Sequence, residues 1–210
     1  MRSKTSRRSF AVAVPLPSWQ SALTGLVVAE AGLVALHLLG LATDSTLLKL
    51  TSEDNIPTWF SSAQFVLAGL ACWLASLEVG RARTAWIALA LLMTAFSVDE
   101  IARLHERFEV HEGAKAAIVV IEPIVAVVVA GFVWSARRHL ERTAATLLAA
   151  AAGSIVLSQA FATIDEELEP TGVGLQLLSI PEEVFEMLAG TFVLAAALAF
   201  LGARQSSKNA

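Results

Sequence analysis

The chain has 210 residues, of which 56% are hydrophobic and 16% are charged, and its formal net charge is −4. That apolar share exceeds the share in ordinary soluble domains, and the apolar residues fall in blocks of about 20, the length that crosses a bilayer core. The single cysteine, Cys72, excludes a disulfide framework and a thiolate metal site. We therefore expect an all-α, polytopic membrane bundle.

The first segment, residues 1–18, is rich in basic residues and predicts a cytoplasmic leader. A cleaved signal peptide is the alternative, but the apolar stretch is short and two prolines interrupt it. A transmembrane domain of about six helices is predicted over residues 19–202, and a disordered cytoplasmic tail over 203–210. The predicted spans are Trp19–Ala42, Pro57–Gly80, Thr84–Leu104, Ala116–Arg137, Thr143–Ile164 and Pro181–Gly202.

The link before the last span, Glu167–Ile180, is the least regular one because Pro170, Gly172 and Gly174 interrupt it. Pro181 is predicted to open the last span in its first turn, where a proline costs no hydrogen bond.

Tryptophans and glycines add two expectations about the spans. The tryptophans near the block ends are expected to anchor the membrane interface; they are Trp19, Trp59, Trp86 and Trp134. The glycines within spans are expected to allow close helix packing; they are Gly25, Gly32, Gly69, Gly131 and Gly190.

Lysine and arginine predict the orientation, because cytoplasmic links carry an excess of both. Eleven of the fifteen fall on the side of the two termini. We therefore expect both termini to lie in the cytoplasm. Of the nineteen acids, seventeen lie on the other side or within the outer and middle parts of the spans. Acids contribute little to topology, so those within spans need another explanation.

The first and third spans each carry two ionisable groups at a spacing of seven residues. Glu30 and His37 lie in the first span, and Asp99 and Glu106 lie in the third. Seven residues turn a helix by about 700°, so each pair shares one helix face. The second span adds only Gln64.

The last three spans carry acids at a similar depth. These are Glu122 before Pro123, Asp165 with Glu166, and Glu182 with Glu183 and Glu186. A charged group left facing lipid costs about 3 kcal/mol or more, so we expect all of them to face one acidic cavity open to the outer side. The predicted lining is Glu30, His37, Asp99, Glu100, His105, Glu106, Glu122, Asp165, Glu166, Glu182, Glu183 and Glu186.

Close carboxylates cannot all ionise in a low-dielectric site, so protons, bound cations or a partner must neutralise this cavity. The leading hypothesis is a divalent metal: zinc, iron, manganese or calcium. The predicted ligands are Glu30, His37, His105, Glu122, Asp165, Glu166, Glu182, Glu183 and Glu186. A metal-activated water would support hydrolysis of a membrane-embedded substrate, with Asp99, Glu100 and Glu106 as candidate catalytic groups.

Two alternatives stay open. Rows of acids and histidines relay protons or bind translocated cations in transporters, although the inner half of the chain offers almost no polar path. The other alternative is a non-catalytic membrane subunit, in which the acids are hydrated at the interface or paired with arginine. The expected partners are the lipid bilayer and a small-molecule or lipid substrate, and no nucleic acid.

Three stretches resemble a group of uncharacterised small bacterial multi-pass membrane proteins. They are NIPTWFSS (Asn55–Ser62), SVDEIARLHE (Ser97–Glu106) and PEEVFEMLAG (Pro181–Gly190). The group carries a D-E-x4-H-E helix and a late E-E-x2-E-M helix. The resemblance supports the multi-pass topology and implies a bacterial inner (cytoplasmic) membrane protein, but it implies no particular activity.

Overall fold

The computed structural model describes residues 16–50, 55–78, 82–102, 130–131, 133–134, 137–168 and 173–209. Five long helices dominate this part of the chain: α1 (Trp19–Thr43), α2 (Ile56–Leu77), α3 (Arg83–Ala102), α6 (Arg142–Leu168) and α7 (Val173–Asn209). Two single 3₁₀ turns are also present: η1 (Thr46–Leu48) lies between α1 and α2, and η2 (Arg137–His139) precedes α6.

Each of the five long helices is apolar and long enough to cross a membrane. This confirms the predicted all-α, multi-pass fold, and the bounds of α1, α2 and α3 agree with the predicted spans to within a few residues. The predicted fourth span, Ala116–Arg137, lies largely outside the described residues.

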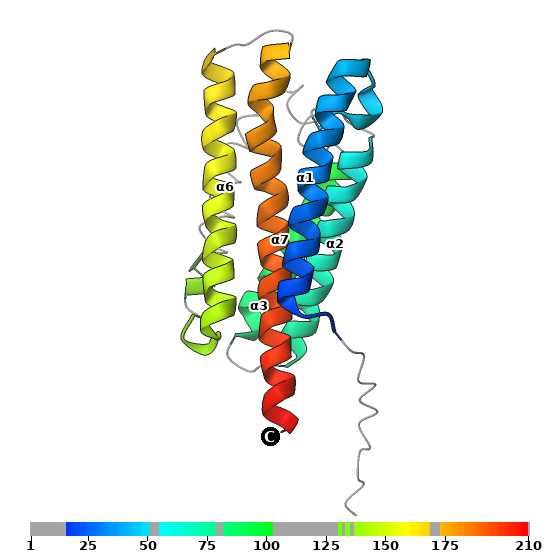
Figure 1. Ribbon diagram of the computed structural model, residues 1–210. Helices are drawn as coiled ribbons and strands as arrows, with labels where there is room; N and C mark the ends of the chain where they lie inside the picture. Colours follow the sequence, from blue (N-terminus) through cyan, green and yellow to red (C-terminus); the bar gives the residue numbers. More distant parts are fainter. Residues whose placement is uncertain are drawn as a thin grey trace, which may run out of the picture.

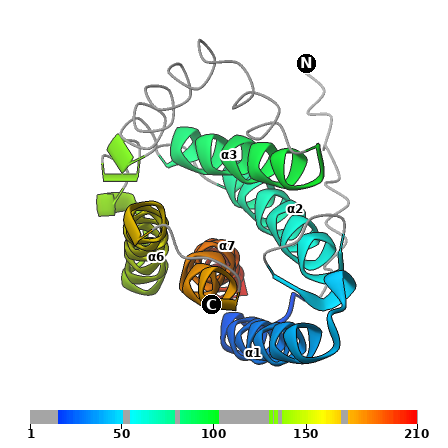
Figure 2. The ribbon, with the colours of Figure 1, turned by 90° about the horizontal axis from the view of Figure 1, so that it is seen from above.

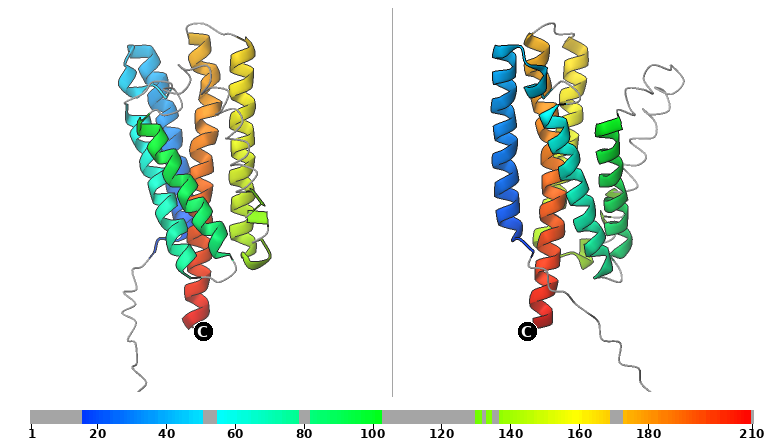
Figure 3. Two further views of the ribbon diagram at one scale, coloured as in Figure 1. Left: turned by 180° about the vertical axis from the view of Figure 1, so that it is seen from behind. Right: turned by 90° about the vertical axis from the view of Figure 1, so that its right-hand side faces the viewer.

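The helices form a bundle in which α7 contacts α1, α2 and α6, while α3 packs on the side of α2 that faces away from α1 (Figures 1 and 2). Helices α1, α3 and α6 run in one direction, and α2 and α7 run in the other (Figure 3). One end of the bundle, called here the η1 end, carries η1 and the start of α7. The opposite C-terminal end carries the start of α1 and the end of α7 (Figure 1).

Local capping explains where α1 and α2 begin and end. Ser18 Oγ accepts a hydrogen bond from the Ser21 N–H at 3.1 Å at the start of α1, and Asn55 Oδ1 accepts one from the Thr58 N–H at 2.9 Å at the start of α2. Both are side chains favoured at helix N-termini. Asp44 ends α1 in the left-handed conformation, with φ 55°, which Asp and Asn tolerate better than most residues.

The C-terminal half of the bundle encloses an apolar core. Its centre is Trp86, which is fully buried and lies 5.3 Å from the Phe200 ring between centroids. The prediction that Trp86 anchors the membrane interface is therefore wrong, because the residue faces α7 and not lipid. Trp59 and Trp134 are well exposed, as an interfacial role requires.

The last helix is longer than predicted in both directions. It begins at Val173, so Pro181 lies inside the helix and does not open it, and most of the predicted link 167–180 is helical. Membrane helices tolerate an internal proline because their surroundings can satisfy the freed backbone group. At its other end, α7 stays helical through Asn209, over most of the segment predicted to be disordered.

Two of the five glycines predicted for close packing have that role. A Cβ on Gly69 would lie 3.2 Å from Thr94 Oγ1 on α3, and one on Gly190 would lie 2.9 Å from the Phe65 ring on α2. At Gly25, Gly32 and Gly131 no described atom lies within 4 Å of the added carbon.

Candidate functional site

Glu30, the most buried acid among the described side chains, lies where three helices meet. Its side chain projects from the middle of α1 and is only 3% exposed. Its Oε1 accepts hydrogen bonds from Thr191 Oγ1 on α7, at 2.5 Å, and from the amide nitrogen of Gln64 on α2, at 2.9 Å. Glu30 therefore ties α1 to both neighbours inside the bundle.

Gln64 is the centre of this contact. Its amide nitrogen also donates to the Met187 carbonyl at 2.9 Å and contacts Thr191 Oγ1. The Met187 carbonyl is an acceptor only, so this bond fixes which end of the amide is nitrogen. The amide oxygen of Gln64 must then point elsewhere.

Two buried oxygens of this cluster have no hydrogen-bond partner among the described residues: Glu30 Oε2 and Gln64 Oε1. Both side chains are at least 97% buried. A buried acceptor that lacks a donor costs about 1–3 kcal/mol, and more when it is charged. The two side chains are joined by the 2.9 Å bond between Gln64 Nε2 and Glu30 Oε1, so both unpartnered oxygens belong to one buried cluster.

His37, two turns after Glu30 on the same face of α1, is also fully buried. The shared burial confirms the predicted face. Its Nδ1 accepts a hydrogen bond from the Leu50 N–H at 2.8 Å, so in the neutral ring the proton is on Nε2. His37 thereby fastens the segment after η1 onto the end of α1.

A second acid, Glu100, lies near the η1 end of α3. Its Oε1 accepts a hydrogen bond from Ser61 Oγ on α2 at 2.5 Å. One turn deeper on α3, Ser97 meets Ser62 with their hydroxyl oxygens 2.9 Å apart. Polar side chains therefore line the α2–α3 contact in this half of the bundle.

A third acid, Glu186, lies in the η1-end half of α7. Its Oε1 accepts a hydrogen bond from Ser158 Oγ on α6 at 3.2 Å. Close by, the rings of Phe161 and Phe185 stack with centroids 5.8 Å apart. Glu186 thus joins α7 to α6 as Glu30 joins α1 to α2.

The predicted acids therefore meet different partners, and the described part of the chain shows three separate contacts for Glu30, Glu100 and Glu186. Asp99, Glu182 and Glu183 lie in the same half of the bundle and are partly exposed. The residues His105, Glu106 and Glu122 lie outside the described residues, and only the backbone is described at Asp165 and Glu166. Among described side chains, no group of three or more His, Cys, Asp or Glu residues could hold a metal ion.

The partners of these acids were not among the predicted site residues. Thr191, Ser61 and Ser158 are uncharged hydroxyl residues within apolar blocks, and Gln64 drew attention only as the one amide of its span. All four are hydrogen-bonding side chains at membrane depth. Such side chains frequently form hydrogen bonds between neighbouring helices in membranes, so this feature could have identified them.

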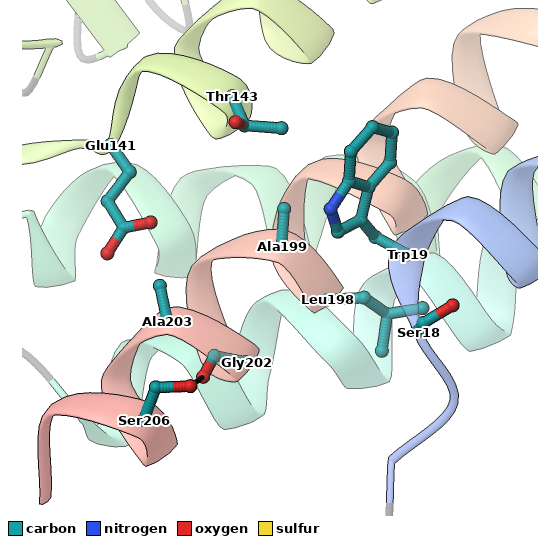
Figure 4. Close-up of a pocket in the computed structure, with 9 residues that line it drawn as sticks. All are labelled: Ser18, Trp19, Glu141, Thr143, Leu198, Ala199, Gly202, Ala203 and Ser206. Carbon is teal, nitrogen blue, oxygen red and sulfur yellow. Dashed lines mark hydrogen bonds between the residues drawn. The ribbon is translucent and has the colours of Figure 1, made fainter. Parts of the chain in front are cut away.

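A cavity of about 310 Å³ lies at the C-terminal end of the bundle, away from Glu30, Glu100 and Glu186. It is formed by the starts of α1 and α6 and the last turns of α7, with Trp19, Glu141 and Thr143 around Ala199 and Gly202 (Figure 4). None of the predicted site residues lines it.

The architecture and its buried polar contacts define a class: a multi-pass helical protein whose helices are apolar enough to span a membrane. The chain belongs to the family described as a domain of unknown function (DUF8692), whose profile matches residues 20–201. No curated protein and no solved structure matches the chain. The predicted resemblance is confirmed as far as membership of an uncharacterised family.

Proposed function

We propose that this protein binds a small cation, either a proton or a metal ion, at Glu30 within its transmembrane bundle. The observation that carries the proposal is the pair of buried oxygens, Glu30 Oε2 and Gln64 Oε1, that lack a donor among the described residues. A carboxylate at membrane depth is functional by default, because its burial is costly without a compensating positive charge.

The candidate ligand atoms favour a hard cation. Glu30, Gln64 and Thr191 bring a carboxylate, an amide and a hydroxyl group into one cluster, and such oxygen ligands suit hard ions such as magnesium, calcium and manganese. A proton on Oε2 would turn that oxygen into a donor, for which Gln64 Oε1 is an acceptor. A metal ion would instead contact both oxygens directly.

The finer hypothesis, a divalent metal that supports hydrolysis of a membrane-embedded substrate, needs several carboxylates and histidines around one ion. Glu30 alone among the predicted ligands lies in the cluster described above. The remaining ligands would have to come from the acids nearer the η1 end, including residues outside the described part of the chain. Cation binding at Glu30 does not depend on that reaction.

The test is a binding measurement on purified protein in mild detergent. Isothermal titration with sodium, potassium, calcium, manganese and zinc chlorides, together with infrared spectroscopy of the carboxyl band across pH, should detect one site per chain. Glu30→Gln should remove it. The matched control is Glu78→Gln, an acid at the C-terminal end that pairs with Lys208, and this variant should bind as the wild type does.

Two results would overturn the proposal. One is a wild-type protein with no cation-dependent heat and with a carboxyl band whose pH dependence is the same as that of Glu30→Gln. The other is a Glu30→Gln variant whose binding matches that of the wild type. Elemental analysis of the gently purified protein identifies the ion if one is retained.

A further inference from the structure

We propose that the cavity at the C-terminal end of the bundle binds a phosphoethanolamine group, either as a free molecule or as the headgroup of a membrane lipid. In this arrangement the ammonium group lies beside Glu141, and the phosphate lies beside the first turns of α1 and α6. The inference is independent of the proposed cation site, because none of the residues that line the cavity belongs to the Glu30 cluster.

The cavity exists because α7 presents small residues where α1 and α6 approach it. Ala199, Gly202 and Ala203 line it from α7, together with Trp19 of α1 and Thr143 of α6 (Figure 4). A Cβ built on Gly202 would meet no described heavy atom of a neighbouring segment within 4 Å. The volume of about 310 Å³ is at the small end of the range of about 300–1,000 Å³ for ligand pockets, so the cavity suits a small polar group and not a large cofactor.

One side of the cavity carries a carboxylate. Glu141 lies directly before α6, and its side chain points towards α7 (Figure 4). Arg138 and Arg142 flank it along the chain, yet its carboxylate forms no ion pair or hydrogen bond with the described residues, whereas Glu78 at the same end of the bundle pairs with Lys208. A carboxylate directed into a cavity is a suitable acceptor for the charge-assisted hydrogen bonds of a ligand's ammonium group.

The opposite charge is provided by the starts of two helices. Helix α1 begins at Trp19 and α6 begins at Arg142, and residues of both first turns line the cavity. The first N–H groups of a helix have no partner within it and give its start a partial positive charge, which favours phosphate oxygens. Two side chains add donors: the indole nitrogen of Trp19 lies on the side of its ring that faces Ala199 (Figure 4), and Thr143 carries a hydroxyl. The cavity therefore combines one negative group with several hydrogen-bond donors.

This combination favours a zwitterion over a simple ion. A ligand with only a positive charge would match Glu141 and leave the helix starts without an acceptor, and a ligand with only a negative charge would be repelled by the carboxylate. A phosphoethanolamine group satisfies both, because only two carbon atoms separate its ammonium group from its phosphate. Trp19 also lies near the end of an apolar block, at the depth where tryptophans meet lipid headgroups, so the group can come from a lipid as well as from solution.

Binding measurements on the purified protein in mild detergent test the ligand. Isothermal titration with phosphoethanolamine should give one saturable site per chain. Ethanolamine and inorganic phosphate each carry one charge of the zwitterion and should bind about tenfold more weakly or worse. Phosphocholine should also bind about tenfold more weakly, because its methylated nitrogen cannot donate a hydrogen bond to Glu141. Native mass spectrometry with phosphatidylethanolamine and phosphatidylcholine measures the same preference for the lipid source.

Two variants and a matched control connect binding with the cavity. Glu141→Gln should weaken binding of phosphoethanolamine by about tenfold or more, because it removes the charge that pairs with the ammonium group. Gly202→Leu should abolish binding by filling the cavity. Glu78→Gln removes a carboxylate at the same end of the bundle, one that pairs with Lys208, and should bind as the wild type does. Thermal unfolding of each variant checks that the fold is intact.

A wild-type protein that binds neither phosphoethanolamine nor phosphatidylethanolamine would overturn the inference. A Glu141→Gln variant with wild-type affinity, or equal binding of phosphoethanolamine and inorganic phosphate, would overturn it too, since neither result leaves a role for the ammonium contact. Binding of the lipid alone, or of the free molecule alone, supports the site and identifies its source. Glu30→Gln should keep this binding, so a failure of the cation site and a failure of the cavity site are separate results.

Discussion

The two halves of the bundle are held together by different interactions. In the η1-end half, helices are joined by buried polar contacts such as Gln64 with Glu30 and Ser61 with Glu100. In the C-terminal half they are joined by apolar packing around Trp86 and by alanines along α7. Lipid tails are as apolar as leucine, so membrane helices associate through packing and hydrogen bonds and not through a hydrophobic driving force. In the described residues, the buried polar contacts between helices gather in the η1-end half, which also holds a smaller apolar cluster of Leu33, Leu50 and Met187.

The separation has a consequence for function. Apolar packing tolerates little change in volume and suits a fixed scaffold. The polar contacts can exchange partners or protons at small cost, since hydrogen bonds between membrane helices contribute only about 0.6 kcal/mol on average. We therefore expect variants in the C-terminal half to affect stability most, and variants in the η1-end half to affect cation binding most.

The largest loss of stability is expected from Trp86→Ala. The side chain is fully buried and packs on Phe200, so truncation leaves a large cavity and should lower the free energy of unfolding by about 3 kcal/mol or more. Trp73→Ala is the matched control, because Trp73 on α2 is half exposed. Reversible unfolding in mild detergent measures both, and equal losses would contradict the assignment of the core.

The next effect is expected at Gly190. An added Cβ would lie 2.9 Å from Phe65 Cε1, so Gly190→Ala must displace that ring and should destabilise the protein by about 1–3 kcal/mol. Gly32→Ala is the control, since no described atom lies within 4 Å of its added carbon and alanine is the better helix former. The comparison fails if both variants shift the unfolding midpoint in the same direction.

A smaller loss of stability is expected from Thr191→Val. This variant keeps the shape of the side chain but removes the hydroxyl that donates to Glu30 and contacts Gln64, which should cost about 1 kcal/mol. Thr163→Val is the control, because Thr163 bonds only the Gln159 carbonyl of its own helix among the contacts described. Cation affinity should fall in Thr191→Val alone, and a loss of affinity in both variants would argue against a site at Glu30.

The smallest effect is expected outside the membrane-spanning helices. The Lys49 ammonium, 2.9 Å from Asp44 Oδ1, lowers the pKa of Asp44 below its ordinary value of 3.8. Because the folded pKa is the lower one, the contact stabilises the fold above the ordinary pKa and loses this contribution as pH falls through the folded pKa. The difference in thermal midpoint between the wild type and Asp44→Asn should therefore be present at pH 6 and shrink as the pH falls below the ordinary pKa of 3.8. A difference that is independent of pH would exclude the carboxylate as its cause.

The burial of individual residues shows which environments sequence patterns predict correctly and which they do not. The spacing of Glu30 and His37 correctly predicted that they share a buried face of α1, because helix geometry alone determines which side chains align. The position of Trp86 at the end of an apolar block led to a wrong prediction of its environment. A tryptophan at that position can either anchor the membrane interface or pack in the core. Only the contact of Trp86 with Phe200 on α7 shows that it is a core residue.

Apolar block length and the distribution of ionisable residues were sufficient to predict an all-α, multi-pass protein and to place acids at membrane depth, because the bilayer imposes a fixed span and a high cost on charge. The tertiary structure decided what those acids meet. The partners Gln64 and Thr191 lie 34 and 161 residues from Glu30 along the chain, and no local pattern encodes such pairings. It also decided that α7 continues through Pro181, because a long helix packed on three neighbours can accommodate one missing hydrogen bond.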